Sequence, residues 1–247
     1  MTNKSTPLVE LKDISISFGG IKAVDKVSVD LHPGEVVGLL GHNGAGKSTL
    51  IKCLSGAYNA EAGEIFISGE KVVINNPRDA RDQNIETIYQ TLALADNLDA
   101  ASNLFLGREI ITKSGFLDES KMEAETRKIM ARLNPNFKKF DVPVSALSGG
   151  QRQRIGIARA LYYDPEVIIF DEATSALDAE SEASITMAIE ALRGNTTVVM
   201  IAHRLSTVRA ADLIVYMDKG RILATGTFEK VRSQVPDFDL QARLFGL

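Results

Sequence analysis

The chain has 247 residues, 45% of them hydrophobic and 24% charged, which is enough for one large or two small domains around a sizeable core. Its 28 Lys and Arg residues against 32 Asp and Glu residues give a net charge of -4, so no overall basic field favours nucleic acid as a partner. The single cysteine, Cys53, excludes an internal disulfide framework and is typical of a reducing compartment. We expect Cys53 to be a small buried residue on a helix.

Two observations bear on membranes. The longest apolar runs, 36–40 and 196–202, are far too short to span a bilayer. The first ten residues lack the apolar core of a signal peptide. We therefore expect a cytoplasmic protein that touches a membrane only through a partner.

The first third of the chain predicts mainly strands. Between residues 8 and 31, two alternating segments are typical of an antiparallel sheet. The continuous apolar run 35–41 ends in glycine and predicts a buried parallel strand, and 47–56 has helical spacing with a glycine stop. Residues 63–74 predict a hairpin whose turn is 68–70.

The pattern changes at about residue 77 and changes back after residue 147. Helical spacing dominates 77–83, 100–107 and 119–133, with breaks rich in Asn, Pro and Lys between them. Strands at 166–172, 196–203, 212–217 and 221–226 then follow helices at 149–162 and near 178–193. We predict one α/β domain spanning 1–247: an antiparallel β subdomain and core at 8–76, an all-helical insertion at 77–147, and the rest of a mainly parallel core at 148–247.

A glycine-rich segment, "GHNGAGKST" at 41–49, lies between the predicted strand and helix, as a phosphate-binding loop requires. Its glycines allow successive N–H groups to point at phosphate oxygens, and the helix dipole adds positive potential. Lys47 can reach the β- and γ-phosphates, the Ser48 hydroxyl can ligate Mg²⁺, and Thr49 adds a hydroxyl near the α-phosphate. The expected nucleotide-binding set is Gly41, His42, Asn43, Gly44, Ala45, Gly46, Lys47, Ser48 and Thr49, with His42 solvated and not catalytic.

A pair of acidic residues ends the strand-like segment "VIIFDE". Asp171 at the carboxyl end of this strand can hold Mg²⁺ through water, and Glu172 can orient and deprotonate an attacking water. Two consecutive acids can also simply cap the next helix. Together with a phosphate loop, the catalytic interpretation is favoured.

The segment "LSGGQ" at 147–151, with "GHNGAGKST" and "IIFDEATSALD", resembles the ATPase subunit of ABC transporters over essentially the whole chain. The resemblance implies a P-loop NTPase (RecA-like) core, ATP as ligand and Mg²⁺ as metal. It places Phe18 on the adenine, Asp178 in the interface loop, and Gln90 at the Mg²⁺ site as the link to the helical insertion. The implied catalytic residues are Glu172, His203, Lys47 and Gln90, and the implied metal ligands are Ser48, Gln90 and Asp171.

The same resemblance implies the partners. In this family two copies pair head to tail, and each ATP lies between one phosphate loop and the other copy's Ser148, Gly149, Gly150 and Gln151. Integral membrane permease subunits would hold the dimer at the inner face of the cell membrane.

The transported substrate is suggested by finer likenesses. Residues 81–109 resemble bacterial carbohydrate importers, although Thr91 stands where those usually carry an acid. From about Gln151 onward, "DEATSALD" and "AHRLSTVRAAD" resemble exporters instead. Carbohydrate import is the favoured function, and an exporter-type or engineered recombinant ATPase is the alternative. DNA-repair and translation ATPases of the superfamily are disfavoured, because 91–146 is too short for their coiled coils and a linker to a second cassette is absent.

Overall fold

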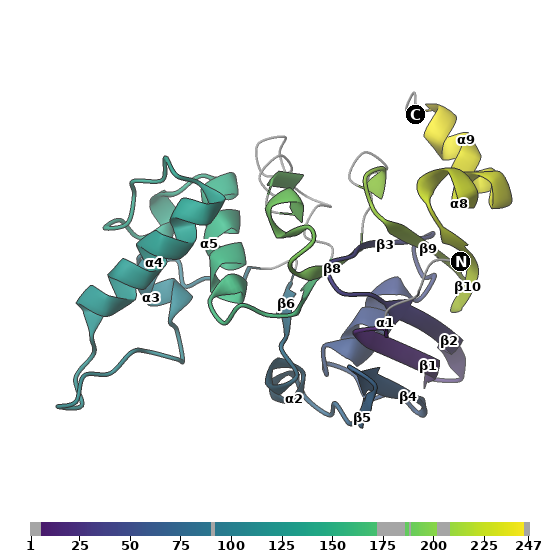
Figure 1. Cartoon of the computed structure of the whole chain (residues 1–247), viewed down its shortest axis with the longest axis horizontal. Coiled ribbons are helices and arrows are strands. Elements are labelled where there is room, and N and C mark those ends of the chain that lie inside the picture. The colour runs from purple at the N-terminus through teal and green to yellow at the C-terminus, as the bar shows by residue number, and fades with distance from the viewer. Residues whose placement is uncertain (1–5, 90–91, 172–185, 188, 202–207, 245–247) are drawn as a thin grey trace.

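The computed structural model describes residues 6–89, 92–171, 186–187, 189–201 and 208–244. These residues form two sheets (Figure 1). A four-stranded sheet has the order β2-β1-β4-β5, and a six-stranded sheet has the order β10-β9-β3-β8-β7-β6. The predicted combination of an antiparallel subdomain with a mainly parallel α/β core is confirmed.

The four-stranded sheet is antiparallel and comes from the first third of the chain. It contains β1 (Val9–Phe18), β2 (Ile21–Leu31), β4 (Ala62–Ile67) and β5 (Glu70–Val72). Ser68 and Gly69 connect β4 to β5 with φ values of 51° and 84°, which is the left-handed conformation that a two-residue hairpin turn requires. Glu70 belongs to β5, where it pairs with Ile67, so the turn is one residue shorter than predicted.

The six-stranded sheet is parallel except at one edge. Its parallel strands are β3 (Val36–Leu40), β6 (Ile85–Ile88), β7 (Val167–Phe170), β8 (Thr197–Ile201) and β9 (Leu213–Asp218). The edge strand β10 (Arg221–Gly226) runs antiparallel to β9. All residues of β3, β7 and β8 are buried, because helices or the other sheet cover both faces.

Each face of this sheet contributes to a different hydrophobic core. In β7, Val167 and Ile169 pack with α1 (Lys47–Leu54), α2 (Pro77–Asp82) and the antiparallel sheet. Ile168 and Phe170, on the opposite face, pack with the remaining helices. Cys53 on α1 lies in the first of these cores and is buried, as predicted. The phosphate-loop helix is thus held between two sheets.

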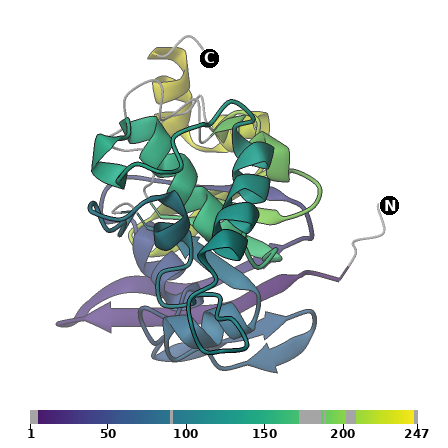
Figure 2. The same ribbon diagram turned by 90° about the vertical axis from the view of Figure 1, so that its left-hand side faces the viewer.

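The helical unit consists of α3 (Ala100–Leu104), α4 (Glu119–Leu133), the 3-10 turn η1 (Val144–Ala146) and α5 (Gly149–Leu161). The three α-helices contact one another and form the left-hand end of the molecule in Figure 1; they stand in front of the sheets in Figure 2. Helix α5 therefore belongs with this unit, although its residues lie beyond the predicted boundary at 147.

The prediction of an all-helical segment at 77–147 is wrong for residues 85–88. Strand β6 pairs with β7 at the edge of the parallel sheet, so the chain returns to the core before it enters the helical unit. Ile85 and Ile88 are buried, whereas Glu86 and Thr87 are only half-buried. A four-residue strand with two polar residues gives too weak a pattern to be recognised.

Two C-terminal helices, α8 (Phe228–Gln234) and α9 (Pro236–Leu244), complete the second core. Of the helix predicted near 178–193, residues 186–187 and 189–192 are described and helical. No helix in the described part of the chain is both long enough and apolar enough to cross a membrane.

Candidate nucleotide-binding site

The loop between β3 and α1 has a backbone that its glycines make possible. Gly41, Gly44 and Gly46 have φ values of 138°, 80° and 98°, in the region that other residues rarely adopt. At two of these positions a side chain would also collide with neighbouring backbone: at Gly41 with the carbonyl oxygen of Met217, and at Gly46 with that of Ala23. Gly41 and Gly46 are therefore required by the packing of β9 and β2 against the loop, whereas Gly44 is required by its backbone conformation alone.

Lys47 is the first residue of α1, yet its side chain turns back over the loop. Its Nζ donates hydrogen bonds to the carbonyl oxygens of Gly41 at 2.7 Å and His42 at 2.9 Å, and only 5% of the residue is exposed. The first turn of α1 contains no acidic residue. A positive helix end and a buried ammonium group therefore act at the same place, which suits a polyanion.

An open cavity of about 590 Å³ adjoins this loop. Its lining comes from the start of β2 and from the loop itself: Ile21, Lys22, Ala23 and residues 43–49. The predicted residues Asn43, Gly44, Ala45, Gly46, Lys47, Ser48 and Thr49 are thus brought together around one space. Ile21, Lys22 and Ala23 were not predicted, because they follow an ordinary Gly19-Gly20 turn that carries no sequence signal for ligand binding.

Asp171 lies at the same end of the six-stranded sheet as the phosphate loop, where the parallel strands finish. Strands β3, β8, β7 and β6 run parallel in neighbouring positions, so their carboxyl ends lie at the same end of the sheet. Asp171 directly follows β7, its backbone N–H donates to the Ile88 carbonyl oxygen at 2.9 Å, and 7% of the residue is exposed. Ser48 and Asp171 thus supply a hydroxyl and a carboxylate at this end of the sheet.

This donor set fits Mg²⁺. Within the described part of the chain, His, Cys, Asp and Glu side chains form no cluster of three or more that would hold a metal ion by themselves. Mg²⁺ commonly takes one or two protein oxygens and completes its shell with phosphates and water. The Ser48 hydroxyl lines the cavity, and the Asp171 carboxylate follows a parallel strand of the same sheet, so both are oxygen donors of the kind that Mg²⁺ takes.

Four predicted site residues, Gln90, Glu172, Asp178 and His203, lie outside the described residues. The last described residues before three of them are Tyr89, Asp171 and Ile201, and these lie at the carboxyl ends of β6, β7 and β8. The roles of the four residues stay predictions.

Phe18 and His42 lie outside the cavity lining. The Phe18 ring, 47% exposed at the end of β1, packs edge-on against Tyr58 with 5.3 Å between centroids. Phe18 pairs across the hairpin with Ile21, which does line the cavity, so its stacking on adenine stays a prediction. The His42 side chain is 51% exposed, with Nε2 3.6 Å from Oδ2 of Asp237 on α9, in agreement with a solvated residue.

The second glycine motif forms the start of α5. Ser148 is the N-cap residue, and its Oγ accepts a hydrogen bond from the Gln151 N–H at 3.3 Å while the Ser148 N–H donates to Gln151 Oε1 at 3.1 Å. Ser148 and Gly149 are exposed, and the first turn has no acidic residue. This helix end also suits an anion, but none of its residues lines the phosphate-loop cavity. In Figure 1, α5 lies in the helical unit and α1 lies well apart, under the six-stranded sheet.

The geometry defines an α/β nucleotide-binding protein: a buried parallel strand, a phosphate loop, a helix, and a carboxylate at the end of a nearby strand. Comparison with known families identifies it further. The family described as "ABC transporter" matches residues 24–175, and the chain belongs to this family. The protein is an ABC-type ATP-binding subunit and an ATPase.

Its relatives include both importers and exporters. The chain is 42% identical to the xylose/arabinose import ATP-binding protein of Sulfolobus acidocaldarius, over 87% of this chain and 86% of that protein. It is 39% identical to the beta-(1-->2)glucan export ATP-binding/permease protein of Agrobacterium fabrum, over 97% of this chain but only 40% of that protein. With the galactose/methyl galactoside import ATP-binding protein of Clostridium perfringens the identity is 39%, over 90% of this chain and 43% of the relative.

Solved structures share the whole fold. An ATP-binding cassette of an ABC transporter in its ADP conformation superposes with a TM-score of 0.82 and 26% identity, covering 96% of this chain and 99% of that one. A dimeric post-hydrolysis state of an ATP-binding cassette bound to ADP and Pi gives a TM-score of 0.72 and 25% identity, covering 89% and 98%.

Proposed function

We propose that this ATPase drives import of a carbohydrate through integral membrane permease subunits, and that it works as a head-to-tail dimer of two copies at the inner face of the cell membrane. One observation carries the proposal. In the part of the chain that the structure describes, the N-termini of α1 and α5 are both suited to phosphate, and of these two the first adjoins the cavity. The exposed second one is available to the nucleotide of another copy.

Each group at the first helix end has a distinct part in binding ATP. The loop amides and Lys47 would hold the β- and γ-phosphates, because they present fixed donors and a buried positive charge. Ser48 and Asp171, with Gln90, would hold Mg²⁺, which neutralises phosphate charge when it is bound. Phe18 and Asp178 would contact the nucleotide from the adenine side and from the dimer interface.

Hydrolysis requires a base for the attacking water. Glu172 follows Asp171 directly and is the candidate, since a carboxylate at this place can orient the water and accept its proton. His203 would contact the γ-phosphate. General-base catalysis of this kind contributes about 10²–10⁴ in rate.

The partner's α5 would close the site. The capping box uses the Ser148 hydroxyl as an acceptor, which leaves its proton to be donated outward. The Gly149 and Gly150 N–H groups belong to the first turn, where helix amides have no partner within the helix. A γ-phosphate bound on another copy would find two exposed donors there, the Ser148 hydroxyl and the Gly149 N–H, together with the N–H of the buried Gly150.

Substitution of Ser148 tests this arrangement. Ser148→Arg should leave ATP binding by the single subunit intact and abolish hydrolysis, because the residue acts on the partner's nucleotide. Ser145→Arg, at another exposed serine nearby, is the matched control and should hydrolyse ATP normally. Mixing Ser148→Arg with Lys47→Ala should recover partial activity, since one composite site then has an intact loop and an intact signature. Loss of ATP binding by Ser148→Arg alone would refute the assignment in trans.

Carbohydrate import is supported by the import relative that matches over most of both chains. The test is affinity capture from detergent-solubilised membranes in the presence of ATP, followed by identification of the bound permease and measurement of its sugar-dependent ATPase. Stimulation by a pentose or hexose supports import. Capture of an export permease instead would favour the second candidate function, an exporter subunit, which is supported by the similarity to the glucan-export protein.

A further inference from the structure

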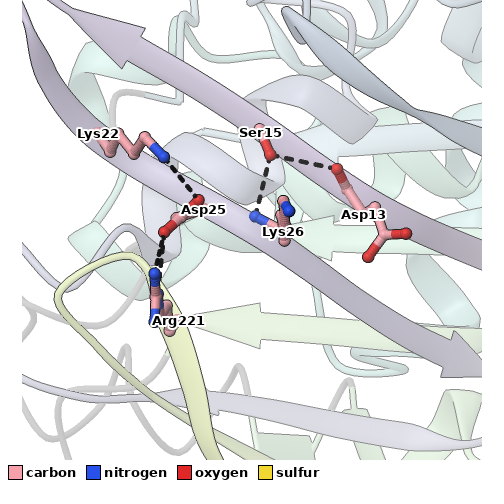
Figure 3. Close-up of polar contacts among 6 residues, drawn as sticks. All are labelled: Asp13, Ser15, Lys22, Asp25, Lys26 and Arg221. Carbon is pink, nitrogen blue, oxygen red and sulfur yellow. Dashed lines mark hydrogen bonds and ion pairs between the residues drawn. The ribbon is translucent and has the colours of Figure 1, made fainter.

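A charged cluster borders the phosphate-loop cavity on the side of β2. Asp25 accepts from two cations, one on each carboxylate oxygen (Figure 3). Lys22 Nζ is 3.2 Å from Oδ1, whereas Arg221 Nε and Nη2 are 2.9 and 2.6 Å from Oδ2. Asp25 is buried, and the side chains of Lys22 and Arg221 are 65% and 70% exposed.

The two cations are held unequally. Arg221 donates two hydrogen bonds to one oxygen through a planar guanidinium, whereas Lys22 makes a single, longer contact. Arg221 therefore neutralises most of the carboxylate charge, and Lys22 is the weaker partner. One carboxylate between two cations leaves a net positive charge at the rim, and Lys22 is the one of the three that lines the cavity.

The carboxylate is fixed relative to the phosphate loop. The Asp25 N–H donates to the Gly220 carbonyl oxygen at 2.8 Å, and the Gly220 N–H donates to the Ala45 carbonyl oxygen at 3.0 Å. Strand β2, the turn between β9 and β10, and the loop are thus connected through backbone hydrogen bonds. Any movement of Asp25 relative to the loop would break this chain of contacts.

We propose that Lys22 is an additional nucleotide-binding residue that turns from Asp25 to the phosphates of a bound di- or triphosphate, and that Asp25 and Arg221 are positioning residues for it. The inference rests on the proposed nucleotide site. Without nucleotide, Asp25 holds the ammonium group beside the cavity. Because Arg221 already compensates the charge of the Asp25 carboxylate, little free energy is needed to break the Lys22–Asp25 ion pair when a polyanion enters the cavity.

Single substitutions give the first test. Lys22→Ala should weaken ATP and ADP binding about fivefold, typical of one solvent-accessible contact with a charged group, and should make the affinity less dependent on salt. Lys22→Arg should restore most of the affinity. The control is Lys26→Ala: Lys26 is an exposed lysine on the same strand, its N–H bonds to Ser15 Oγ, and it does not line the cavity. This control should bind like the wild type.

A charge-balance experiment tests the positioning residues. Arg221→Gln leaves Lys22 as the main cation on Asp25 and should weaken ATP binding, although it removes a side chain outside the cavity lining. Adding Asp25→Asn to this variant removes the competing carboxylate and should restore the affinity. A purely structural role would change the free energy of unfolding in step with the affinity, because Arg221→Gln alone leaves a buried carboxylate with its weaker partner and Asp25→Asn relieves that cost. The positioning role predicts that the affinity still changes under conditions in which every variant is fully folded. Circular dichroism and urea unfolding identify the temperature range in which all variants are folded.

The outcomes separate this inference from the proposed function. Wild-type protein that fails to bind ATP refutes the nucleotide site itself. Wild type that binds ATP, with Lys22→Ala unchanged, refutes only the role of Lys22. An equal loss for ATP, ADP and adenosine would also overturn it, because Lys22 would then contact the nucleoside and not the phosphates.

Discussion

Replacing Gly46 by alanine tests the packing of the phosphate loop directly. Gly46 is the N-cap of α1 and has a φ of 98°. An added Cβ would lie closer than 3.0 Å to the carbonyl oxygen of Ala23 and 3.3 Å from the Cα of Gly220. Both neighbours are backbone atoms of packed strands and turns, so neither can rotate away as the end of a side chain can.

The expected cost has two parts. A left-handed backbone costs a non-glycine residue about 1–2 kcal/mol. Overpacking against backbone typically adds about 1–3 kcal/mol. The matched control is Gly69→Ala in the β4–β5 turn, where φ is 84° and nothing lies within 4 Å of an added Cβ. Gly69→Ala should therefore show the first cost alone.

Urea unfolding of the nucleotide-free protein measures the difference. With a denaturant dependence of roughly 2 kcal/mol per molar urea, the midpoint of Gly46→Ala should lie about 0.5–1.5 M below that of Gly69→Ala. Titration with a fluorescent ATP analogue should show normal affinity for Gly69→Ala and a large loss for Gly46→Ala. Equal midpoints for the two variants would refute the conclusion that β2 constrains the loop.

Three further predictions concern catalysis, reactivity and pH. Glu172→Gln should lower ATP hydrolysis by about 10²–10⁴ while the ATP-bound dimer persists in size-exclusion chromatography; near-normal turnover would exclude Glu172 as the base. Burial raises the pKa of the Cys53 thiol from 9.0 to about 11, so its thiolate is about 100-fold rarer. Labelling by iodoacetamide, measured by mass spectrometry, should therefore be slow until the protein unfolds. Rapid labelling of the native protein would contradict this. The hydrogen bond from Arg221 holds the pKa of Asp25 below 3.8. This carboxylate therefore stabilises the fold above that pH, and its contribution is lost as the pH falls through the lowered pKa. In acid, the free energy of unfolding of Asp25→Asn should fall less steeply with pH than that of the wild type, and an unchanged acid transition would argue against the ion pair.

The sequence predicted those parts of the fold whose pattern is local. Residues 36–40 and 167–170 are apolar throughout because both faces of the strand are covered, and such runs are easily recognised. Strand β6 was missed because it is an edge strand of four residues with Glu86 and Thr87 in its middle. Helix α5 was assigned to the core because its sequence does not show which of its neighbours it packs against.

In the candidate site, too, the residues in a local motif were predicted from the sequence and those brought together by the tertiary structure were not. Glycine spacing determines the local backbone, so the loop at 41–49 was found directly. The contact of Asp25 with Arg221 joins residues 196 positions apart, and no periodicity or motif indicates it. The cavity wall at Ile21, Lys22 and Ala23 depends on how the β1–β2 hairpin lies over the loop, which is a property of the tertiary structure.

The central place of β3 has consequences for how the chain folds as it is synthesised. Its neighbours in the sheet, β8 and β9, come from the last quarter of the sequence, so both edges of β3 are unpaired until that part of the chain has been made. The carbonyl oxygen of Met217 that packs on Gly41 also arrives only then. A nascent or truncated chain that ends before Leu213 would contain every residue of the phosphate-loop motif and still lack the surroundings that shape the loop.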